Sequence, residues 1–307
     1  MVEHVARVDW NIAQRPSPSS PNAHRLYRAV VVGPEQGAVH TELAIGGLQP
    51  GGWLNRHVHS YEEALYVLSG ELLLELNGRV HRLAAGDYAF MPVGSWHALG
   101  NDAEDDVRWL SVNTPQRLAA DAGRGDTFFA PEPFRLDSLA EQARRPPFGD
   151  PSLRYIGHYA GTPPQAEALA VTDPARGRRP AGMDTAILAY SGISVKMLVD
   201  RNFGAELLTM FTVDYEPGGA AQVHDHPFEE AYFFLDGEIE AEIDGKARTV
   251  RAGDVVFAGV GVTHGFFNTG SGRVRWIETQ APQPPARHAY RWIGSWERFE
   301  RDLRQAE

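Results

Sequence analysis

The stretch that decides the fold runs from Gly51 to Gly70, "GGWLNRHVHSYEEALYVLSG", and it places two histidines one residue apart, ahead of a Glu-Glu pair. A second stretch from Gly218 to Gly237, "GGAAQVHDHPFEEAYFFLDG", repeats this pattern at a shift of 167 residues (218 minus 51). The two stretches align without a gap. A repeat this close predicts that one structural unit occurs twice in the chain.

The repeat extends beyond the histidine cluster in both directions. Upstream, "AVHTELAIGGLQPGG" aligns with "AELLTMFTVDYEPGG", and downstream "VRWLSVNTPQ" aligns with "VRWIETQAPQ". Because 307 residues suffice for two average domains, we predict two copies of one domain, at about 25–116 and 192–283. The predicted organisation is an N-terminal barrel over 1–116, a connector over 117–191, a C-terminal barrel over 192–283 and a C-terminal amphipathic helix over 284–307.

Each copy consists of short apolar segments separated by tight-turn signals. Polar and apolar residues alternate along "EALYVLSGELLLELNGRVHRLAAGDYAFMP", and the alternation stops at Ser69-Gly70, Asn77-Gly78 and Ala85-Gly86. The second copy stops at Asp236-Gly237, Asp244-Gly245 and Ala252-Gly253. Short strands joined by such turns, with no helical periodicity between them, predict an all-β fold of antiparallel sandwiches or barrels.

The two remaining segments differ from the copies in composition. The connector is rich in proline, which excludes long regular elements. Within it, "SLAEQAR" predicts a short helix after a Ser138 cap, and "LRYIGHYA" predicts a strand. At the C-terminus, Trp292, Trp296 and Phe299 recur at helical spacing among charged residues, which predicts an amphipathic helix that packs on a barrel or on a second copy of the chain.

Alternation along a strand also predicts a metal site in each copy. His57 and His59 point to the same face, Glu63 can return to that face after the turn, and His97 arrives from a later strand. Three neutral imidazoles and one carboxylate form a nitrogen and oxygen site for a divalent metal and leave coordination positions open for substrate. The predicted ligands are His57, His59, Glu63 and His97 in the first copy and His224, His226, Glu230 and His264 in the second.

These spacings resemble those of the cupin superfamily. Its first motif, Gly-x5-His-x-His-x3-Glu-x6-Gly, is met from Gly51 to Gly70 and again from Gly218 to Gly237. Its second motif, Gly-x5-Pro-x-Gly-x2-His-x3-Asn, is met by the first copy, whereas the second copy has Gly259 in place of the proline. That proline shapes a turn and binds no metal. The resemblance implies a bicupin, with two small jelly-roll barrels that each hold a metal by three histidines and one glutamate.

Composition narrows the partners. A formal charge of −11 argues against a phosphate backbone or an anionic membrane, because both would repel the chain. The chain has no cysteine, so disulfides and thiolate ligands are excluded. Its start lacks the basic and apolar regions of a signal peptide, and no apolar run is long enough to span a membrane, so we expect a cytoplasmic protein that binds a small molecule.

The neighbours of the predicted ligands differ between the copies. Asn55 and Trp96 in the first copy, and Gln222 and Gln280 in the second, are candidate substrate contacts. For each of them, a barrel-lining role with polar groups satisfied by neighbours is the alternative. The surroundings are largely apolar and aromatic, which suits an uncharged or weakly charged organic substrate.

Function is argued from the site, since this fold supports many chemistries. The favoured hypothesis is a dioxygenase that binds a small enolisable or phenolic substrate beside dioxygen, with iron, manganese or nickel as the metal and up to two ions per chain. Glu63 or Glu230 would accept the substrate proton. The resemblance includes quercetin-type dioxygenases, which keep the three-histidine, one-glutamate set in each barrel.

Two alternatives stay open. The first is a non-redox isomerase, decarboxylase or hydrolase, for which zinc is also suitable, and the second is a ligand-binding cupin without turnover. Oxalate-type decarboxylation is disfavoured, because a dianion requires an arginine in the pocket and Arg56 has outward parity. Gentisate-type dioxygenases generally use three histidines in one barrel, which does not match the retained glutamates. We expect the two barrels to pack as an intramolecular pseudo-dimer, and a homodimer is a further option.

Overall fold

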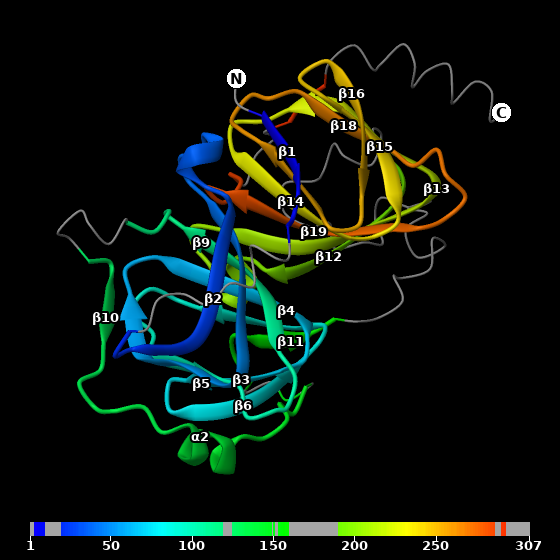
Figure 1. The fold of residues 1–307 in the computed structure, drawn as a ribbon. Helices are drawn as coiled ribbons and strands as arrows, with labels where there is room; N and C mark the ends of the chain where they lie inside the picture. The colour runs from blue at the N-terminus through cyan, green and yellow to red at the C-terminus, as the bar shows by residue number, and fades with distance from the viewer. Residues whose placement is uncertain are drawn as a thin grey trace.

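The chain folds into two curled ten-stranded β-sheets, which form two lobes in Figure 1. This computed structural model describes residues 3–9, 20–118, 125–148, 150, 153–159, 190–285 and 290–292. The all-β fold predicted from the turn signals is confirmed, and both sheets are antiparallel. Within the described residues, no helix is long and apolar enough to cross a membrane.

The N-terminal sheet has the order β11-β7-β4-β9-β3-β8-β5-β6, and β2 and β10 also pair with β3. Its strands are β2 (Ala23–Val32), β3 (Glu42–His59), β4 (Glu62–Ser69), β5 (Glu71–Leu76), β6 (Arg79–Ala84), β7 (Asp87–Met91), β8 (His97–Gly100), β9 (Val107–Thr114), β10 (Thr127–Phe129) and β11 (Ile156–His158). A short 3-10 helix, Pro34–Gln36, precedes β3.

The C-terminal sheet has the matching order β1-β17-β14-β19-β13-β18-β15-β16, and β12 and β20 also pair with β13. Its strands are β1 (Glu3–Arg7), β12 (Tyr190–Val199), β13 (Thr209–Asp225), β14 (Glu229–Asp236), β15 (Glu238–Ile243), β16 (Lys246–Arg251), β17 (Asp254–Ala258), β18 (His264–Phe267), β19 (Val274–Ala281) and β20 (Arg291–Trp292). A 3-10 helix over Arg201–Phe203 precedes β13. The internal repeat is therefore a repeat of topology.

In two segments, strand pairing crosses the predicted domain boundaries. Strand β1 lies in the range 1–116 but pairs with β17, so it extends the C-terminal sheet. The connector instead contributes β10 and β11 to the N-terminal sheet. Strands β1 and β11 occupy equivalent edge positions in the two sheets, because each sheet needs an added strand to cover the same unpaired edge.

The predicted helices have separate outcomes. The connector helix exists as α2 (Leu136–Gln142), but it begins two residues before Ser138, so Ser138 is not its cap. The predicted strand in "LRYIGHYA" is confirmed as β11. Of the predicted C-terminal helix, Arg291 and Trp292 belong to β20, which pairs with β13, and residues 293–307 lie outside the described part.

Apolar side chains fill each barrel and also the space between the barrels. Leu65 and Val67 on β4 face the interior of the N-terminal barrel, whereas the alternate residues Ala64 and Tyr66 join a cluster that includes residues of both sheets. Phe233 on β14 enters that same shared cluster. The two barrels thus pack against each other through a continuous apolar interface, as an intramolecular pseudo-dimer.

Two buried glutamates connect the barrels across this interface. The carboxylate of Glu62 accepts hydrogen bonds from the backbone N–H groups of residues 206, 207 and 208 at 2.7, 2.9 and 3.2 Å. The carboxylate of Glu229, its equivalent, accepts from residues 39, 40 and 41 at 2.6, 2.9 and 3.0 Å. Each barrel therefore binds the loop that precedes the longest strand of the other.

Candidate metal centres

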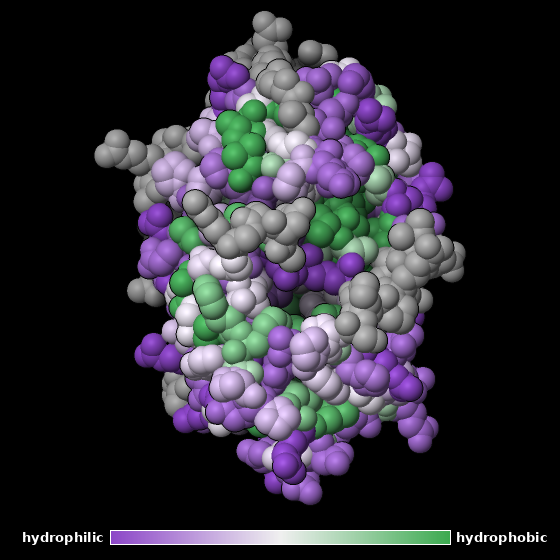
Figure 2. Space-filling model, turned by 60° about the vertical axis from the view of Figure 1, so that its left-hand side comes forward, coloured by the Kyte–Doolittle hydropathy of each residue, from purple (hydrophilic) through white to green (hydrophobic). Residues whose placement is uncertain are grey.

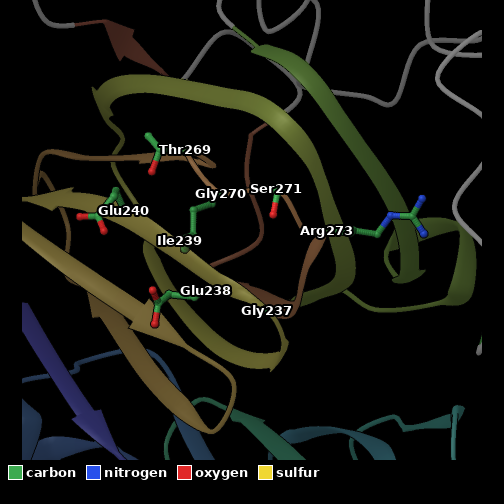
Figure 3. Close-up of a pocket in the computed structure, with 9 residues that line it drawn as sticks. Gly237, Glu238, Ile239, Glu240, Thr269, Gly270, Ser271 and Arg273 are labelled. Atoms are coloured by element: carbon green, nitrogen blue, oxygen red, sulfur yellow. The ribbon is translucent and has the colours of Figure 1, made fainter.

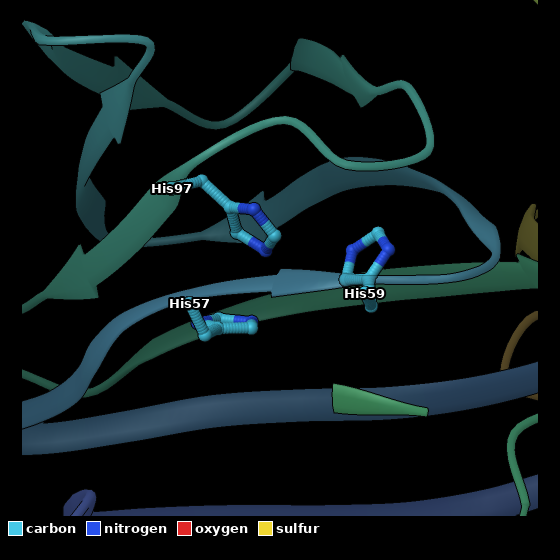
Figure 4. A group of neighbouring side chains, drawn as sticks. All are labelled: His57, His59 and His97. Atoms are coloured by element: carbon cyan, nitrogen blue, oxygen red, sulfur yellow. The ribbon is translucent and has the colours of Figure 1, made fainter. Parts of the chain in front are cut away.

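The fold brings together the four predicted ligands of the N-terminal barrel. His57 and His59 lie at the end of β3, after a register shift between Leu54 and His57, and His57 pairs directly with His97 of β8. The three imidazoles face one another (Figure 4), and their ligand atoms lie within 4.8 Å of one another. His224, His226 and His264 form the equivalent group in the C-terminal barrel.

Every one of these six imidazoles is oriented by a backbone carbonyl. Because a carbonyl only accepts, each Nδ1 carries the proton and donates it. The bonds join His57 to Asn55 at 2.8 Å, His59 to Tyr61 at 2.6 Å, His97 to Ser95 at 2.9 Å, His224 to Gln222 at 2.7 Å, His226 to Phe228 at 2.8 Å and His264 to Val262 at 3.0 Å. This tautomer leaves each Nε2 with a lone pair for a metal.

The donor set fits a divalent transition metal. The Nε2 atoms of His59, His97 and His226 are buried and have no hydrogen-bond partner. A buried imidazole nitrogen without a partner is unfavourable in a protein interior, and metal coordination would satisfy it. Imidazole nitrogen with carboxylate oxygen suits iron, manganese, nickel or zinc.

Glu63 completes the N-terminal site. Its Oε2 lies 3.4 Å from His59 Nε2 and 3.8 Å from His97 Nε2, and its Oε1 accepts a hydrogen bond from the Ser111 hydroxyl at 2.7 Å. Burial acts to raise the pKa of this carboxyl, but His59, His97 and Ser111 outweigh burial and hold that pKa well below its usual range. Glu63 is thus an anion at neutral pH, as a metal ligand must be.

Three of these histidines have pKa values lowered by their surroundings, which favours neutral imidazole. Burial, together with the neighbouring His97, lowers the pKa of His57 to about 3. Burial likewise lowers the pKa of His97 to about 4, although the charge of Glu63 acts in the opposite direction. In the C-terminal barrel, burial and His264 lower the pKa of His224 well below its usual range. Neutral imidazole is the form that binds metal.

The glutamate of the C-terminal site has more partners than that of the N-terminal site. Glu230 Oε1 accepts from Gln280 Nε2 at 2.7 Å, and its Oε2 accepts from the Tyr232 hydroxyl. The same Oε2 lies 2.9 Å from His226 Nε2 and 3.0 Å from His264 Nε2. In the N-terminal barrel, Leu65 replaces the tyrosine, and within the described residues Ser111 is the one hydroxyl that bonds to Glu63.

A second carboxyl group lies beside Glu230. Glu278 replaces Ser111 at the equivalent position and accepts a hydrogen bond from Trp276 Nε1 at 3.0 Å. Burial, and then the charge of Glu230, raise the pKa of Glu278 well above its usual range, while the pKa of Glu230 is lowered by its histidine neighbours against the effect of burial. The pKa values of the two carboxyl groups in the C-terminal site are therefore displaced in opposite directions.

The two sites also differ in solvent access. The Glu63 side chain is 16% exposed, whereas the Glu230 side chain is 2% exposed. Tyr290 lies over the C-terminal site, with its ring 5.4 Å from His224 and its hydroxyl 3.3 Å from Gln280. At the N-terminal site, Phe129 of β10 has its ring 5.3 Å from His57 and is itself 36% exposed. The N-terminal site is the more accessible.

The predicted substrate contacts have other partners. Asn55 is buried, and its amide donates to Asn22, Ala130 and Glu132 at 3.3–3.4 Å. Trp96 packs its ring 5.4 Å from the Arg56 guanidinium, which points away from His57, as the alternation predicted. For these two residues, substrate binding stays a prediction.

The two candidate contacts in the C-terminal barrel differ from each other. Gln222 is half-buried and orients His224 through its backbone carbonyl. Gln280 uses its amide nitrogen on Glu230 and Tyr290, and its oxygen accepts from Thr209 at 3.1 Å. Here too, substrate binding stays a prediction, and the observed role of Gln280 is to orient Glu230.

Sequence reasoning missed a charged group around the N-terminal site. Arg28 donates to Glu42 at 2.5 Å, and Glu42 accepts from Asn113 at 3.0 Å. Both Arg28 and Arg117 interact electrostatically with Glu63. None of these three charged residues has a charged equivalent in the other copy, where Val195, Thr209 and Pro284 occur, and that difference was the available signal.

A surface groove lies away from the predicted ligands. A groove lies between the turns at Gly237–Glu240 and Thr269–Arg273 (Figure 3), and its lining includes none of the predicted ligands. Seen from another side, hydrophilic and hydrophobic residues are interspersed, and a hollow lies near the middle of that face (Figure 2). The groove of Figure 3 is thus separate from both metal centres.

Comparison with known proteins agrees with the fold and the site. The cupin domain model matches residues 44–113 and 211–279, which contain the first motif of each copy and most of each barrel. The chain is therefore a bicupin, with two cupin domains. The family resemblance and the jelly-roll architecture predicted from the two motifs are thereby confirmed.

Individual relatives are distant. Gentisate 1,2-dioxygenase from Ralstonia sp is 27% identical over 146 residues, which is 41% of this chain and 41% of that protein, so the chain matches less than half the length of this relative. Salicylate 1,2-dioxygenase from Pseudaminobacter salicylatoxidans superposes with a TM-score of 0.65 at 14% identity, over 91% of this chain and 84% of that one. Oxalate decarboxylase from Bacillus subtilis gives 0.58 at 18% identity, over 99% and 82%. These structures share the fold.

Proposed function

We propose that this bicupin is a metal-dependent dioxygenase that converts a small phenolic or enolisable substrate in its N-terminal barrel. The observation that carries the proposal is the contrast between the two glutamates. Glu63 completes a three-histidine group and keeps solvent access, whereas Glu230 is enclosed by Tyr232, Gln280 and Tyr290. A substrate needs the accessible site.

A metal held by His57, His59, His97 and Glu63 would supply Lewis acidity and, for a redox-active ion, electron exchange with dioxygen. The protein residues prepare that centre. The backbone carbonyls fix the three rings, and the Ser111 hydroxyl holds one oxygen of Glu63 at 2.7 Å. Its other oxygen, Oε2, faces the imidazoles of His59 and His97, and on loosening from the metal it would accept the proton of a substrate hydroxyl, so that Glu63 would serve as the general base.

The C-terminal barrel fits a supporting role. Its three histidines are equally well oriented, so we propose that it also binds a metal ion. Tyr232 and Gln280 restrain Glu230 from two directions, which disfavours the movement that a general base needs. The gentisate dioxygenase relative supports the reaction class, although its identity is low and its match partial.

Oxygen uptake by the iron(II)-loaded protein tests the proposal. We expect uptake with at least one member of a panel of gentisate, salicylate and a flavonol. His57→Ala should abolish uptake, and His224→Ala, its equivalent in the other barrel, should retain most of it. Loss of uptake in His224→Ala with full retention in His57→Ala would show that the assignment of the barrels is wrong.

A non-redox decarboxylase is the second candidate. Arg56 points outward and cannot serve an oxalate-type decarboxylation, but Arg28 and Arg117 lie within electrostatic reach of Glu63. Cations near the site would stabilise a small carboxylate substrate. Release of carbon dioxide from such a substrate without oxygen uptake would favour this function over the dioxygenase, and binding without any turnover would favour a ligand-binding cupin.

A further inference from the structure

Arg117 lies next to the N-terminal metal centre. It follows β9 by three residues, and its guanidinium carbon lies 6.0 Å from the centroid of the Tyr61 ring. Tyr61 in turn stacks on the His59 ring at 3.9 Å, with the two planes 8° apart. A path of direct side-chain contacts thus leads from the guanidinium to a predicted metal ligand.

Within the described residues, the Arg117 guanidinium forms no ion pair. Its Nε is buried without a hydrogen bond, and no carboxylate of the described residues lies within 4.0 Å of the guanidinium. The acids around it are already engaged. Glu42 accepts from Arg28, Glu63 accepts from Ser111, and Asp126 accepts from the Thr127 hydroxyl at 2.9 Å.

Such an arrangement is unfavourable unless something completes it. Arg117 is half-buried, with its Nε shielded from water, and charged groups shielded from water in folded proteins are normally paired. Burial alone would lower the pKa of Arg117. The nearby acidic groups outweigh burial and raise that pKa, so the side chain stays charged. These groups are Tyr61, Glu63, Glu42 and Asp126. An anion supplied from outside the chain would provide the missing partner.

The cation is specific to the accessible barrel. Proline occupies the equivalent position, 284, in the C-terminal copy, where the glutamate is enclosed. In the N-terminal barrel, Phe129 adds an exposed aromatic surface 5.3 Å from His57. One site therefore offers a metal centre, an aromatic surface and an unpaired guanidinium, a combination that suits an organic acid with an apolar or aromatic body.

We infer that Arg117 recognises the carboxylate of an organic acid bound at the N-terminal metal centre. The inference rests on the proposal that this centre takes the substrate, and it deepens that proposal by giving the substrate class. It differs from the sequence-based expectation of an uncharged or weakly charged substrate, and the experiment below distinguishes the two. The guanidinium forms charge-assisted hydrogen bonds to the carboxylate while the metal-proximal group of the acid reaches Glu63.

Calorimetric binding to the zinc-loaded protein tests the inference without turnover, since zinc has no redox chemistry here. The probes are gentisate and salicylate, each paired with its carboxamide. We expect the wild type to bind at least one acid about tenfold or more tightly than its amide, the difference of a charge-assisted bond. In Arg117→Gln, that preference should disappear, while the affinity for the amide changes little.

Matched variants separate recognition from folding. Arg79→Gln removes an exposed arginine of the same barrel and should keep the preference, and Arg117→Lys should keep part of it because the charge remains. Zinc content and thermal unfolding of each variant identify a folding defect. Equal binding of acid and amide by the wild type, which needs no substitution, would overturn the inference, as would an unchanged preference in folded Arg117→Gln.

The two proposals fail separately. Zinc-loaded protein that prefers the acid, together with iron-loaded protein that consumes no oxygen, would leave Arg117 as the recognition residue and remove the dioxygenase. Oxygen uptake without any preference for the acid would keep the dioxygenase and remove the role of Arg117.

Discussion

At the scale of single residues, orientation decides which atoms can act. Each site histidine donates Nδ1–H to a carbonyl two residues away, so a local backbone hydrogen bond sets the tautomer. Glu63 then converges on the Nε2 side of His59 and His97. The chemistry of the site depends on these short-range bonds, which the repeat reproduces in the second barrel.

Metal analysis of the purified protein gives the first residue-scale prediction. We expect about two metal equivalents per chain in the wild type and about one in His57→Ala or His224→Ala, because the loss of one imidazole typically disables a site. The double variant should hold almost none. Full wild-type content in each single variant would contradict the two-site interpretation.

At the scale of elements, glycines form the turns that set the direction of the strands. Gly70 ends β4 with φ of +77°, and a Cβ there would lie 2.6 Å from the backbone oxygen of Asp106. Gly78, in the turn between β5 and β6, has a similar φ of +81° but open space around it. The two glycines share a conformation and differ in packing, so one of them controls for the other.

Alanine at these two positions gives an element-scale prediction. Gly78→Ala should lower the free energy of unfolding by about 1–2 kcal/mol, the cost of a left-handed residue with a Cβ. Gly70→Ala should cost clearly more, roughly 3 kcal/mol or above, because the backbone of the β8–β9 connection must move. Urea unfolding curves measure both. Equal costs would show that the contact with Asp106 relaxes freely.

At the scale of the whole molecule, the two barrels behave as one packed unit. They share an apolar cluster and bind each other through Glu62 and Glu229. Strand β1, at the start of the chain, pairs with β17 of the C-terminal sheet. Glu62 directly precedes Glu63, so the anchor between the barrels and the metal ligand lie on adjacent residues of β4. Glu62 itself is buried, so it is a structural acid that connects the barrels.

Substitution of these anchors gives the whole-molecule prediction. Glu62→Gln turns an amide group toward backbone N–H donors, so at least one donor loses its acceptor, and we expect a loss of about 1–3 kcal/mol in the free energy of unfolding. Glu229→Gln should behave alike, by the symmetry of the contacts. Glu71→Gln, at an exposed position, should change stability by less than about 0.5 kcal/mol. A cost for Glu62→Gln as small as that of Glu71→Gln would contradict the anchoring role.

The sequence by itself determined the two barrels and the eight predicted ligands. Strand alternation and tight turns act over a few residues, so spacing alone places His57 and His59 on one face and returns Glu63 to it. The internal repeat supplied the second site at the same time.

Only the tertiary structure decided how the charged groups are paired and which site is accessible. Three interactions join parts of the chain that are distant in sequence. They are the hydrogen bonds of Glu62 to residues 206–208, the contact of Arg117 with Tyr61 and the enclosure of Glu230 by Tyr290. Strand β1 likewise pairs across the length of the chain. No local spacing encodes such contacts, because they arise from the packing of one barrel on the other and from segments that pack over each site from distant parts of the sequence.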